Sequence, residues 1–294
     1  MRDQSLVHAL SLLPPALRSC FREEQPMRMP VEEIRLRSGR PIMVSAAGLE
    51  REVPGSGPVT AAQLRQVMEN VTGSSLHSAA ESLKRGYVTA SGGCRVGICG
   101  TAAVSGGAVG SIREISSLCI RVAREQPGIA APLLHLLNEK GRILNTIVIS
   151  PPGFGKTTLL RDMVRLVSDR GIRVALADER GELAAVTGGV PRFDVGAHTD
   201  VMTGAPKEYA VMTLLRTMTP HVIALDEISE ACDARAVALA ANCGTAIFAT
   251  VHGYDRQDVL ARPVLAEIRA RGIFRRAVTI RLEDGKRSFL TEAI

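Results

Sequence analysis

A glycine-rich turn between an apolar run and a helical pattern is the feature that most constrains the fold of this chain. The turn reads PPGFGKTT over residues 151–158, after an apolar run at 147–149 and before a helical pattern at 159–166. A strand, a glycine turn and a helix in this order are the context of a phosphate-binding loop, because the glycines let backbone N–H groups converge on phosphate oxygens. We therefore expect a sheet that carries this loop at a strand end.

Two side chains of the loop have predicted roles. Lys156 is expected to reach the terminal phosphates of a nucleotide, and the Thr157 hydroxyl is expected to bind Mg²⁺. The full motif has a glycine five positions before Gly155, where this chain has Ser150, and a serine can hold that turn if its φ angle is negative. A chance glycine turn is the alternative, which the flanking pattern disfavours. The predicted nucleotide contacts are Pro152, Gly153, Phe154, Gly155, Lys156, Thr157 and Thr158.

A second motif is an apolar strand that ends in two carboxylates, with the sequence HVIALDE at 221–227. At a strand end beside a phosphate loop, one carboxylate can hold the Mg²⁺ shell and the next can polarise an attacking water. We therefore predict Asp226 as a magnesium ligand and Glu227 as the general base. A buried strand with a solvated acidic pair is the alternative, and the upstream loop weakens it.

Other candidates follow two further strands. Glu179, in the acidic turn at 178–182, is expected to position water or metal, with a plain charged turn as the alternative. His252 ends the strand after the acidic pair and is expected to sense the γ-phosphate, although a lone histidine is often structural. No arginine is expected to complete the site within one chain. Arg180 and Arg216 are the candidates for an arginine supplied by a neighbouring subunit, and Arg216 also fits a surface position.

Downstream of a boundary near 126–143, strands and helices alternate, which predicts a mostly parallel sheet flanked by helices over residues 127–294. A short helix at 129–139 is expected to precede this sheet. The expected strands are 143–150, 172–177, 221–226, 244–250, 275–282 and 287–291. The expected helices are 156–169, 206–217, 229–242 and 255–271, the last disturbed by Pro263.

Residues 1–126 have a mixed pattern and predict a smaller α+β domain in which nothing indicates catalysis. Helices are expected at 4–21, 60–70 and 75–83, a strand at 31–37 and a glycine-marked hairpin at 92–100.

Composition favours a soluble enzyme. Hydrophobic residues make up 46% of the 294 residues and charged residues 22%, which is enough for a sizeable core and argues against disorder. The net charge of +6 permits nucleic acid, anionic lipid or acidic partners, but the scattered arginines favour a solvated surface. Aromatic residues are 3%, which leaves little for base stacking.

The cysteines and the hydropathy pattern indicate in which cellular compartment the chain is expected. The six cysteines form no C-x-x-C pair, and we interpret them as small buried hydrophobes in a reducing compartment. Cys94 and Cys99 would lie on opposite faces of a continuous strand. The first apolar run breaks at Pro14-Pro15, so no signal peptide is expected, and no segment has the roughly 20 apolar residues of a membrane span. Membrane contact is therefore expected through partners.

The order of phosphate loop, D-E-R-G-E turn, L-D-E strand end and A-T-V-H strand end resembles the RecA-like ATPases of bacterial secretion and pilus systems. More narrowly, the chain is similar to the stage III sporulation AA family. The resemblance covers nearly the whole chain. The segments that carry the narrower resemblance are EEIRLRSGRP at 32–41, GCRVGICG at 93–100, ISSLCIRVARE at 115–125 and TDVMTGAPK at 199–207.

The resemblance implies an α/β fold, with a RecA-like P-loop NTPase core after the α+β domain, which would serve assembly or docking. It implies ATP and Mg²⁺ as ligands, hydrolysis of ATP to ADP and phosphate, and a homo-oligomeric ring, a hexamer by analogy, with nucleotide at subunit interfaces. It also implies a cytoplasmic protein on the mother-cell side, docked on membrane proteins of the stage III sporulation channel complex. A RecA-like nucleic-acid motor and a nucleotide-gated scaffold with little turnover remain as alternatives, and nothing in the sequence distinguishes ATP from GTP.

Overall fold

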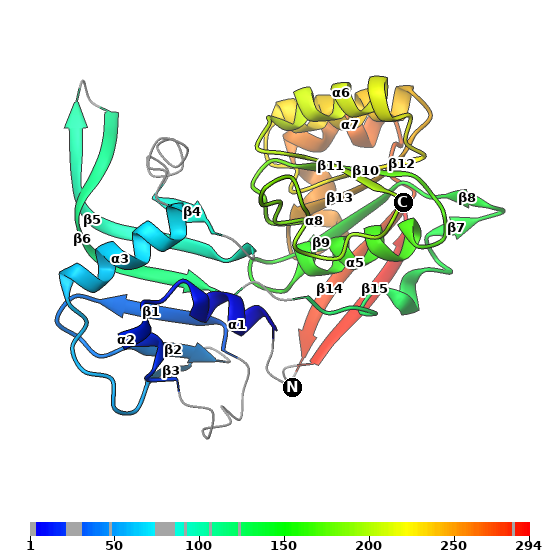
Figure 1. Cartoon of the computed structure of the whole chain (residues 1–294). Helices are drawn as coiled ribbons and strands as arrows, with labels where there is room; N and C mark the ends of the chain where they lie inside the picture. Colours follow the sequence, from blue (N-terminus) through cyan, green and yellow to red (C-terminus); the bar gives the residue numbers. More distant parts are fainter. Residues whose placement is uncertain are drawn as a thin grey trace. The chain divides into compact units, whose positions relative to one another are not determined.

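The computed structural model describes residues 4–21, 31–46, 49–73, 86–90, 93–105, 108–122, 125–283 and 286–294. The chain divides into two compact units, residues 1–124 and 125–294 (Figure 1). Among the described residues, the first unit has one hydrophobic core and the second has one on each face of its sheet.

The first unit is built on an antiparallel sheet with the strand order β3-β2-β1-β6-β5-β4. In β1 the odd and even positions alternate between half-buried and buried, as expected for a sheet with one face against a core. Helix α3 starts with a capping box between Thr60 and Gln63 and ends at Gly73, which has a φ of 58°. The strands are β1 (Glu33–Arg37), β2 (Met43–Ala46), β3 (Leu49–Glu52), β4 (Tyr87–Thr89), β5 (Arg95–Ser105) and β6 (Ala108–Arg121). The helices are α1 (Gln4–Ser11), α2 (Pro15–Arg18) and α3 (Ala61–Thr72).

Two predictions for this unit need correction. The helix expected at 4–21 is two helices, because Pro14 and Pro15 interrupt it and Pro15 starts α2. The hairpin expected at 92–100 is mostly one strand, because β5 runs on from Arg95 to Ser105. Gly100 lies at an irregularity of the β5–β6 pairing, where a Cβ atom would come within 2.7 Å of the Arg113 carbonyl oxygen. The helix expected at 75–83 lies outside the described residues.

The second unit contains a seven-stranded sheet with the order β11-β10-β12-β13-β9-β14-β15. All neighbours are parallel except β14 and β15, which form an antiparallel hairpin. The strands are β9 (Thr146–Ser150), β10 (Val174–Asp178), β11 (Thr199–Thr203), β12 (Val222–Leu225), β13 (Ala246–His252), β14 (Arg276–Glu283) and β15 (Lys286–Ala293). The helices are α5 (Lys156–Ser168), α6 (Lys207–Met218), α7 (Ala231–Asn242), α8 (Arg256–Ala261) and α9 (Ala266–Ala270), with 3-10 turns η2 (Ala131–Leu133) and η3 (Pro263–Leu265). The small hairpin β7 (Asn138–Glu139) and β8 (Arg142–Ile143) lies apart from this sheet.

Helices cover both faces of this sheet, and so the central strands are buried on both sides. Ile147 and Ile149 of β9 belong to one core, with residues of α6, α7 and α9, whereas Val148 belongs to the other, with residues of α5. Figure 1 shows α5 and the α6–α7 pair on opposite sides of the strands. The mixed α/β fold with a mainly parallel sheet is the arrangement expected from the sequence.

The structure differs from the expectations for this unit in one strand and two helices. The edge strand β11 was not expected. The helix expected at 129–139 is only a 3-10 turn, and its last expected residues, 138 and 139, form strand β7 and pair with β8. The helix expected at 255–271 is divided at Pro263 into α8, η3 and α9, as the proline suggested.

The cysteines are all free, and the prediction that they are buried holds only for Cys94, since Cys20, Cys119 and Cys232 are half-buried and the other two are exposed. Cys94 is buried, whereas Cys99 and Cys243 are exposed. Cys94 and Cys99 therefore lie on opposite faces, as their spacing predicts.

Candidate nucleotide-binding site

The site is centred on the loop between β9 and α5. Gly153 and Gly155 have φ angles of 82° and 94°, a region that favours glycine, and Gly155 is the N-cap of α5. No side chain caps this helix, so its first N–H groups face the loop and favour an anion there. Ser150 ends β9 without a positive φ, as expected for a serine in place of the first motif glycine.

Strand order brings three predicted residues together beside this loop. Since β12, β13 and β9 are parallel neighbours, their carboxyl ends meet at one edge. Lys156 Nζ lies 3.1 Å from His252 Nε2, which lies 3.3 Å from Glu227 Oε2. Burial lowers the pKa of Lys156, and the charges of Glu227 and Asp226 offset part of this shift.

His252 occupies the middle of this contact chain. The ring nitrogen Nε2 can accept a hydrogen bond from the Lys156 ammonium group or donate one to the Glu227 carboxylate, but it cannot do both at once. The other ring nitrogen, Nδ1, is buried without a hydrogen-bond partner in the part of the chain that the structure describes. His252 therefore has two alternative partners, both of them predicted functional residues.

The acidic pair lies directly after β12. Asp226 is 3% exposed, and its carboxylate is 3.5 Å from the Thr250 hydroxyl of β13. Asp226 and the Thr157 hydroxyl offer the hard oxygen donors that Mg²⁺ prefers. Within the described residues, no group of three or more His, Cys, Asp or Glu side chains is arranged to hold a metal ion. That finding is compatible with Mg²⁺ at a nucleotide site, which binds one or two protein ligands and completes its shell with water and phosphate.

The acidic turn after β10 is fixed by its backbone. Asp178 accepts hydrogen bonds from the N–H groups of Glu182, Leu183 and Ala184 at 2.9–3.1 Å. Burial raises the pKa of Asp178, and these N–H groups oppose that shift. From α5, Arg161 donates to the carbonyl oxygens of Leu183 and Glu182, both at 2.6 Å.

Glu179 and Glu182 of this turn have different surroundings. Glu179, a predicted site residue, lies 3.3 Å from Lys207 Nζ, and Lys207 lies 3.1 Å from Asp233 at the start of α7. Glu182 was not predicted, yet its charge is among those that raise the pKa of Lys156 against burial. The D-E-R-G-E sequence contains both glutamates and does not distinguish them. Their different surroundings are visible only in the three-dimensional structure.

Arginines of the same chain lie beside predicted site residues. Arg180 Nη1 lies 3.6 Å from Glu227 Oε2. Arg287 of β15, which sequence reasoning missed, lies against Gly155. Arg216 is exposed in the last turn of α6.

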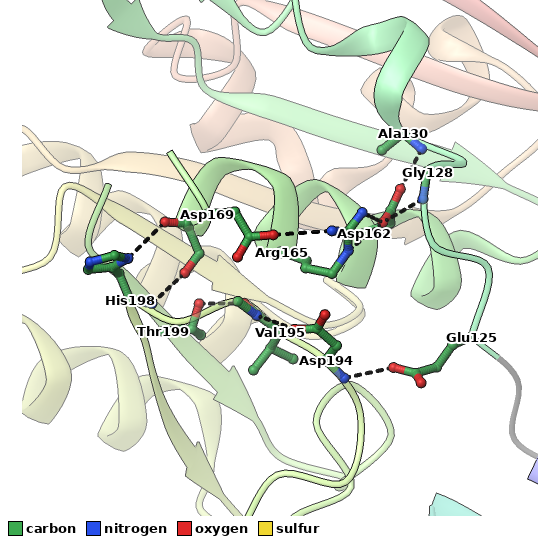
Figure 2. Close-up of polar contacts among 12 residues, drawn as sticks. Glu125, Gly128, Ala130, Asp162, Arg165, Asp169, Asp194, Val195, His198 and Thr199 are labelled. Atoms are coloured by element: carbon green, nitrogen blue, oxygen red, sulfur yellow. Dashed lines mark hydrogen bonds and ion pairs between the residues drawn. The ribbon is translucent and has the colours of Figure 1, made fainter. Parts of the chain in front are cut away.

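The first residues of the second unit form hydrogen bonds with α5 and with the loop that contains Asp194 (Figure 2). Asp162 accepts from Gly128 and Ala130, and Glu125 accepts from the N–H of Asp194 at 2.7 Å. Thr158, a predicted nucleotide contact, lines a shallow hollow here with Glu125, Gln126, Pro127, Arg161, Asp162, Arg165 and Asp194.

None of the helices in the described ranges is long and apolar enough to cross a membrane.

Solved structures of low sequence identity share this fold. The ATPase DotB of Legionella pneumophila is 17% identical, with a TM-score of 0.59, and the match covers 98% of this chain and 78% of DotB. The pilus retraction motor PilT with bound ADP is also 17% identical, with a TM-score of 0.61, and the match covers 91% of this chain and 80% of PilT. At such identity these likenesses establish the fold.

Sequence comparisons are more specific. Stage III sporulation protein AA of Bacillus subtilis (strain 168) is 34% identical over 263 residues, which cover 87% of this chain and 85% of that protein. Protein SEEDLING PLASTID DEVELOPMENT 1 of Arabidopsis thaliana is 31% identical over 155 residues, 52% of this chain and 22% of that protein. The family model described as "Sporulation stage III, protein AA" matches residues 3–289. This chain therefore belongs to the sporulation stage III protein AA family, which confirms the resemblance drawn from its motifs.

Proposed function

We propose that this protein hydrolyses ATP to ADP and phosphate with Mg²⁺, and that it does so as the ATPase of a secretion-like assembly in endospore formation. The observation that carries the proposal is the contact chain from Lys156 through His252 to Glu227 beside a glycine loop. Family membership supports the sporulation role, and the fold shared with the ATPase DotB and the motor PilT supports the enzymatic one.

In the proposed reaction, the loop N–H groups and Lys156 bind the phosphates. A water oxygen attacks the γ-phosphorus while Glu227 accepts a proton from that water. At the same time the bond between the γ-phosphorus and the bridging oxygen breaks, and ADP leaves with that oxygen. Thr157 and Asp226 would hold Mg²⁺, which supplies charge neutralisation on the β- and γ-phosphates when bound. Arg180, 3.6 Å from Glu227, orients that carboxylate.

His252 gives this site a means of sensing the γ-phosphate. When phosphate oxygens accept the Lys156 ammonium protons, the histidine nitrogen no longer has to accept from Lys156 and can donate to Glu227. Glu227, already beside Arg180, would then gain the hydrogen bond from His252 only with nucleotide present. Glu179 is proposed to position water or metal from the acidic turn, held by Lys207.

Assembly is a further part of the proposal. We propose a homo-oligomeric ring, hexameric by analogy, in the cytoplasm, with residues 1–126 as the assembly or docking part and membrane proteins of the sporulation channel complex as partners. No segment here indicates nucleic-acid binding. Arg216, exposed on α6, remains the candidate for an arginine supplied to a neighbouring subunit.

ATP binding and turnover of Lys156→Ala and Glu227→Gln, measured over a range of protein concentrations, test the proposal. Lys156→Ala should lose binding, whereas Glu227→Gln should bind Mg-ATP without hydrolysing it, because the amide keeps the shape and loses the basicity. Glu139→Gln, an exposed position on β7 apart from the seven-stranded sheet, is the control and should behave as wild type. Wild-type turnover in folded Lys156→Ala would refute the site, and turnover per chain that is independent of concentration in a monomer would refute the ring.

A further inference from the structure

Arg287 reaches the nucleotide loop because of the strand order at one edge of the sheet. Strand β14 is the parallel neighbour of β9, pairing Thr279 with Ile149, so its last residues continue past the end of β9 toward the loop. The chain then turns back into β15, where Arg287 pairs with Leu282. The start of β15 is thereby placed beside the loop, although 132 positions of sequence separate Arg287 from Gly155.

The guanidinium group of Arg287 lies directly on the loop backbone. A Cβ atom built on Gly155 would come within 3.2 Å of Arg287 Cζ and Nη2 and within 3.4 Å of Nε. On its other side, Nη1 donates to the Gln126 amide oxygen at 2.6 Å. Two contacts therefore hold an exposed, long side chain against the N-terminus of α5.

This is an unfavourable place for a cation in electrostatic terms. The N-terminus of a helix carries a positive partial charge, and Lys156 adds a full charge at the next residue. Arg287 has a neutral amide as its hydrogen-bond partner among the described residues. By contrast, Arg165, Arg262 and Arg271 of this unit all pair with carboxylates, each at 2.7 Å. An anion bound at the loop would supply a carboxylate-like partner, which Arg287 does not have among the described residues.

We infer that Arg287 binds a phosphate group of the nucleotide held by its own chain. The inference rests on the proposed function. Two donors of the guanidinium face the loop, and a planar fork of this kind matches phosphate oxygens. The arginine comes from within the chain and from the C-terminal hairpin, so it is distinct from any arginine that a neighbouring subunit supplies.

The test is displacement of a fluorescent ADP analogue from the full-length protein by Mg-ADP, by inorganic pyrophosphate and by adenosine. Arg287→Gln should weaken Mg-ADP and pyrophosphate binding by roughly 10- to 100-fold, the usual effect of losing a charge-assisted hydrogen bond. Adenosine binding should not change. Arg287→Lys should restore part of the loss, since it keeps the charge without the fork. Arg170→Gln, an exposed arginine just after the C-terminal end of α5, is the matched control and should bind as wild type.

Thermal unfolding of each variant checks that the fold is kept, as expected for an exposed side chain. Equal Mg-ADP affinity in wild type and Arg287→Gln would overturn the inference and leave the proposed function standing. A loss confined to adenosine would also overturn it, because the residue would then act on the nucleoside. A wild-type protein that binds none of these ligands would overturn the proposed function, and the inference with it.

Discussion

Lys207→Met is expected to destabilise the second unit strongly, because Lys207 is a buried cation shared by two carboxylates. Its side chain is 4% exposed and lies 3.1 Å from Asp233, which is 5% exposed, and 3.3 Å from Glu179, which is 32% exposed. Burial lowers the pKa of Lys207, but the two carboxylates more than offset this and raise it overall. The methionine would leave the buried Asp233 charge without its cation.

The size of the effect follows from what Asp233 retains. Removing one partner of a buried ion pair costs about 3–5 kcal/mol. Asp233 keeps the N–H groups of Ser229 and Glu230, at 2.9 and 3.0 Å, so the lower end of that range applies. For a unit of this size, about 3 kcal/mol corresponds to a decrease in Tm of roughly 6–12 °C.

Differential scanning calorimetry of the full chain measures this decrease. Arg235→Met is the matched control, because Arg235 pairs with Glu208 at 3.1 Å between the same two helices but both side chains are exposed. Its Tm should stay near that of wild type. Adding Asp233→Asn to Lys207→Met should recover part of the loss, since it removes the unpaired charge and keeps an oxygen acceptor. A Tm unchanged by Lys207→Met, or an equal decrease in Arg235→Met, would refute the reasoning.

Two other predictions concern the pH dependence of Tm and the binding of Mg-ADP. The Tm difference between wild type and Lys207→Met should be constant from about pH 5 to 9; it should shrink below about pH 4, as Asp233 with its lowered pKa protonates, and above about pH 10, as Lys207 with its raised pKa deprotonates. An unchanged difference at pH 3 would contradict the pairing. Gly155→Ala should weaken Mg-ADP binding more than Gly153→Ala, because both have positive φ but only Gly155 also faces Arg287. Equal losses would mean that backbone strain alone is responsible.

Much of the second unit could be predicted because its strands are buried on both faces. Such strands are short apolar runs, and β9, β12 and β13 lie where the sequence predicts them. Strand β11, with the sequence TDVMT, was missed because it lies at the sheet edge and has exposed polar positions. The helix expected at 129–139 has suitable apolar spacing, but only a 3-10 turn forms, and residues 138 and 139 pair with β8 as strand β7.

The site was predictable where a motif or a strand end carries the information. The loop itself, Asp226, Glu227 and His252 follow strands whose carboxyl ends meet in a parallel sheet. The sequence did not indicate that Lys207 lies beside Glu179 or that Arg287 lies beside Gly155. Their positions depend on how α6 packs against α7 and on β14 being the neighbour of β9, and neither arrangement has a local sequence signal.

Helix α5 connects two parts of the candidate site, the glycine loop and the acidic turn. It begins in the phosphate loop, and Arg161 in its second turn donates to the acidic turn through the carbonyl oxygens of Leu183 and Glu182. Arg161 is 6% exposed and stacks 3.9 Å above the Phe193 ring, and its burial lowers its pKa to about 10. A buried guanidinium with two carbonyl acceptors has little freedom to move. The acidic turn therefore keeps a fixed position relative to the glycine loop, because one helix carries both the loop and the side chain that holds the turn.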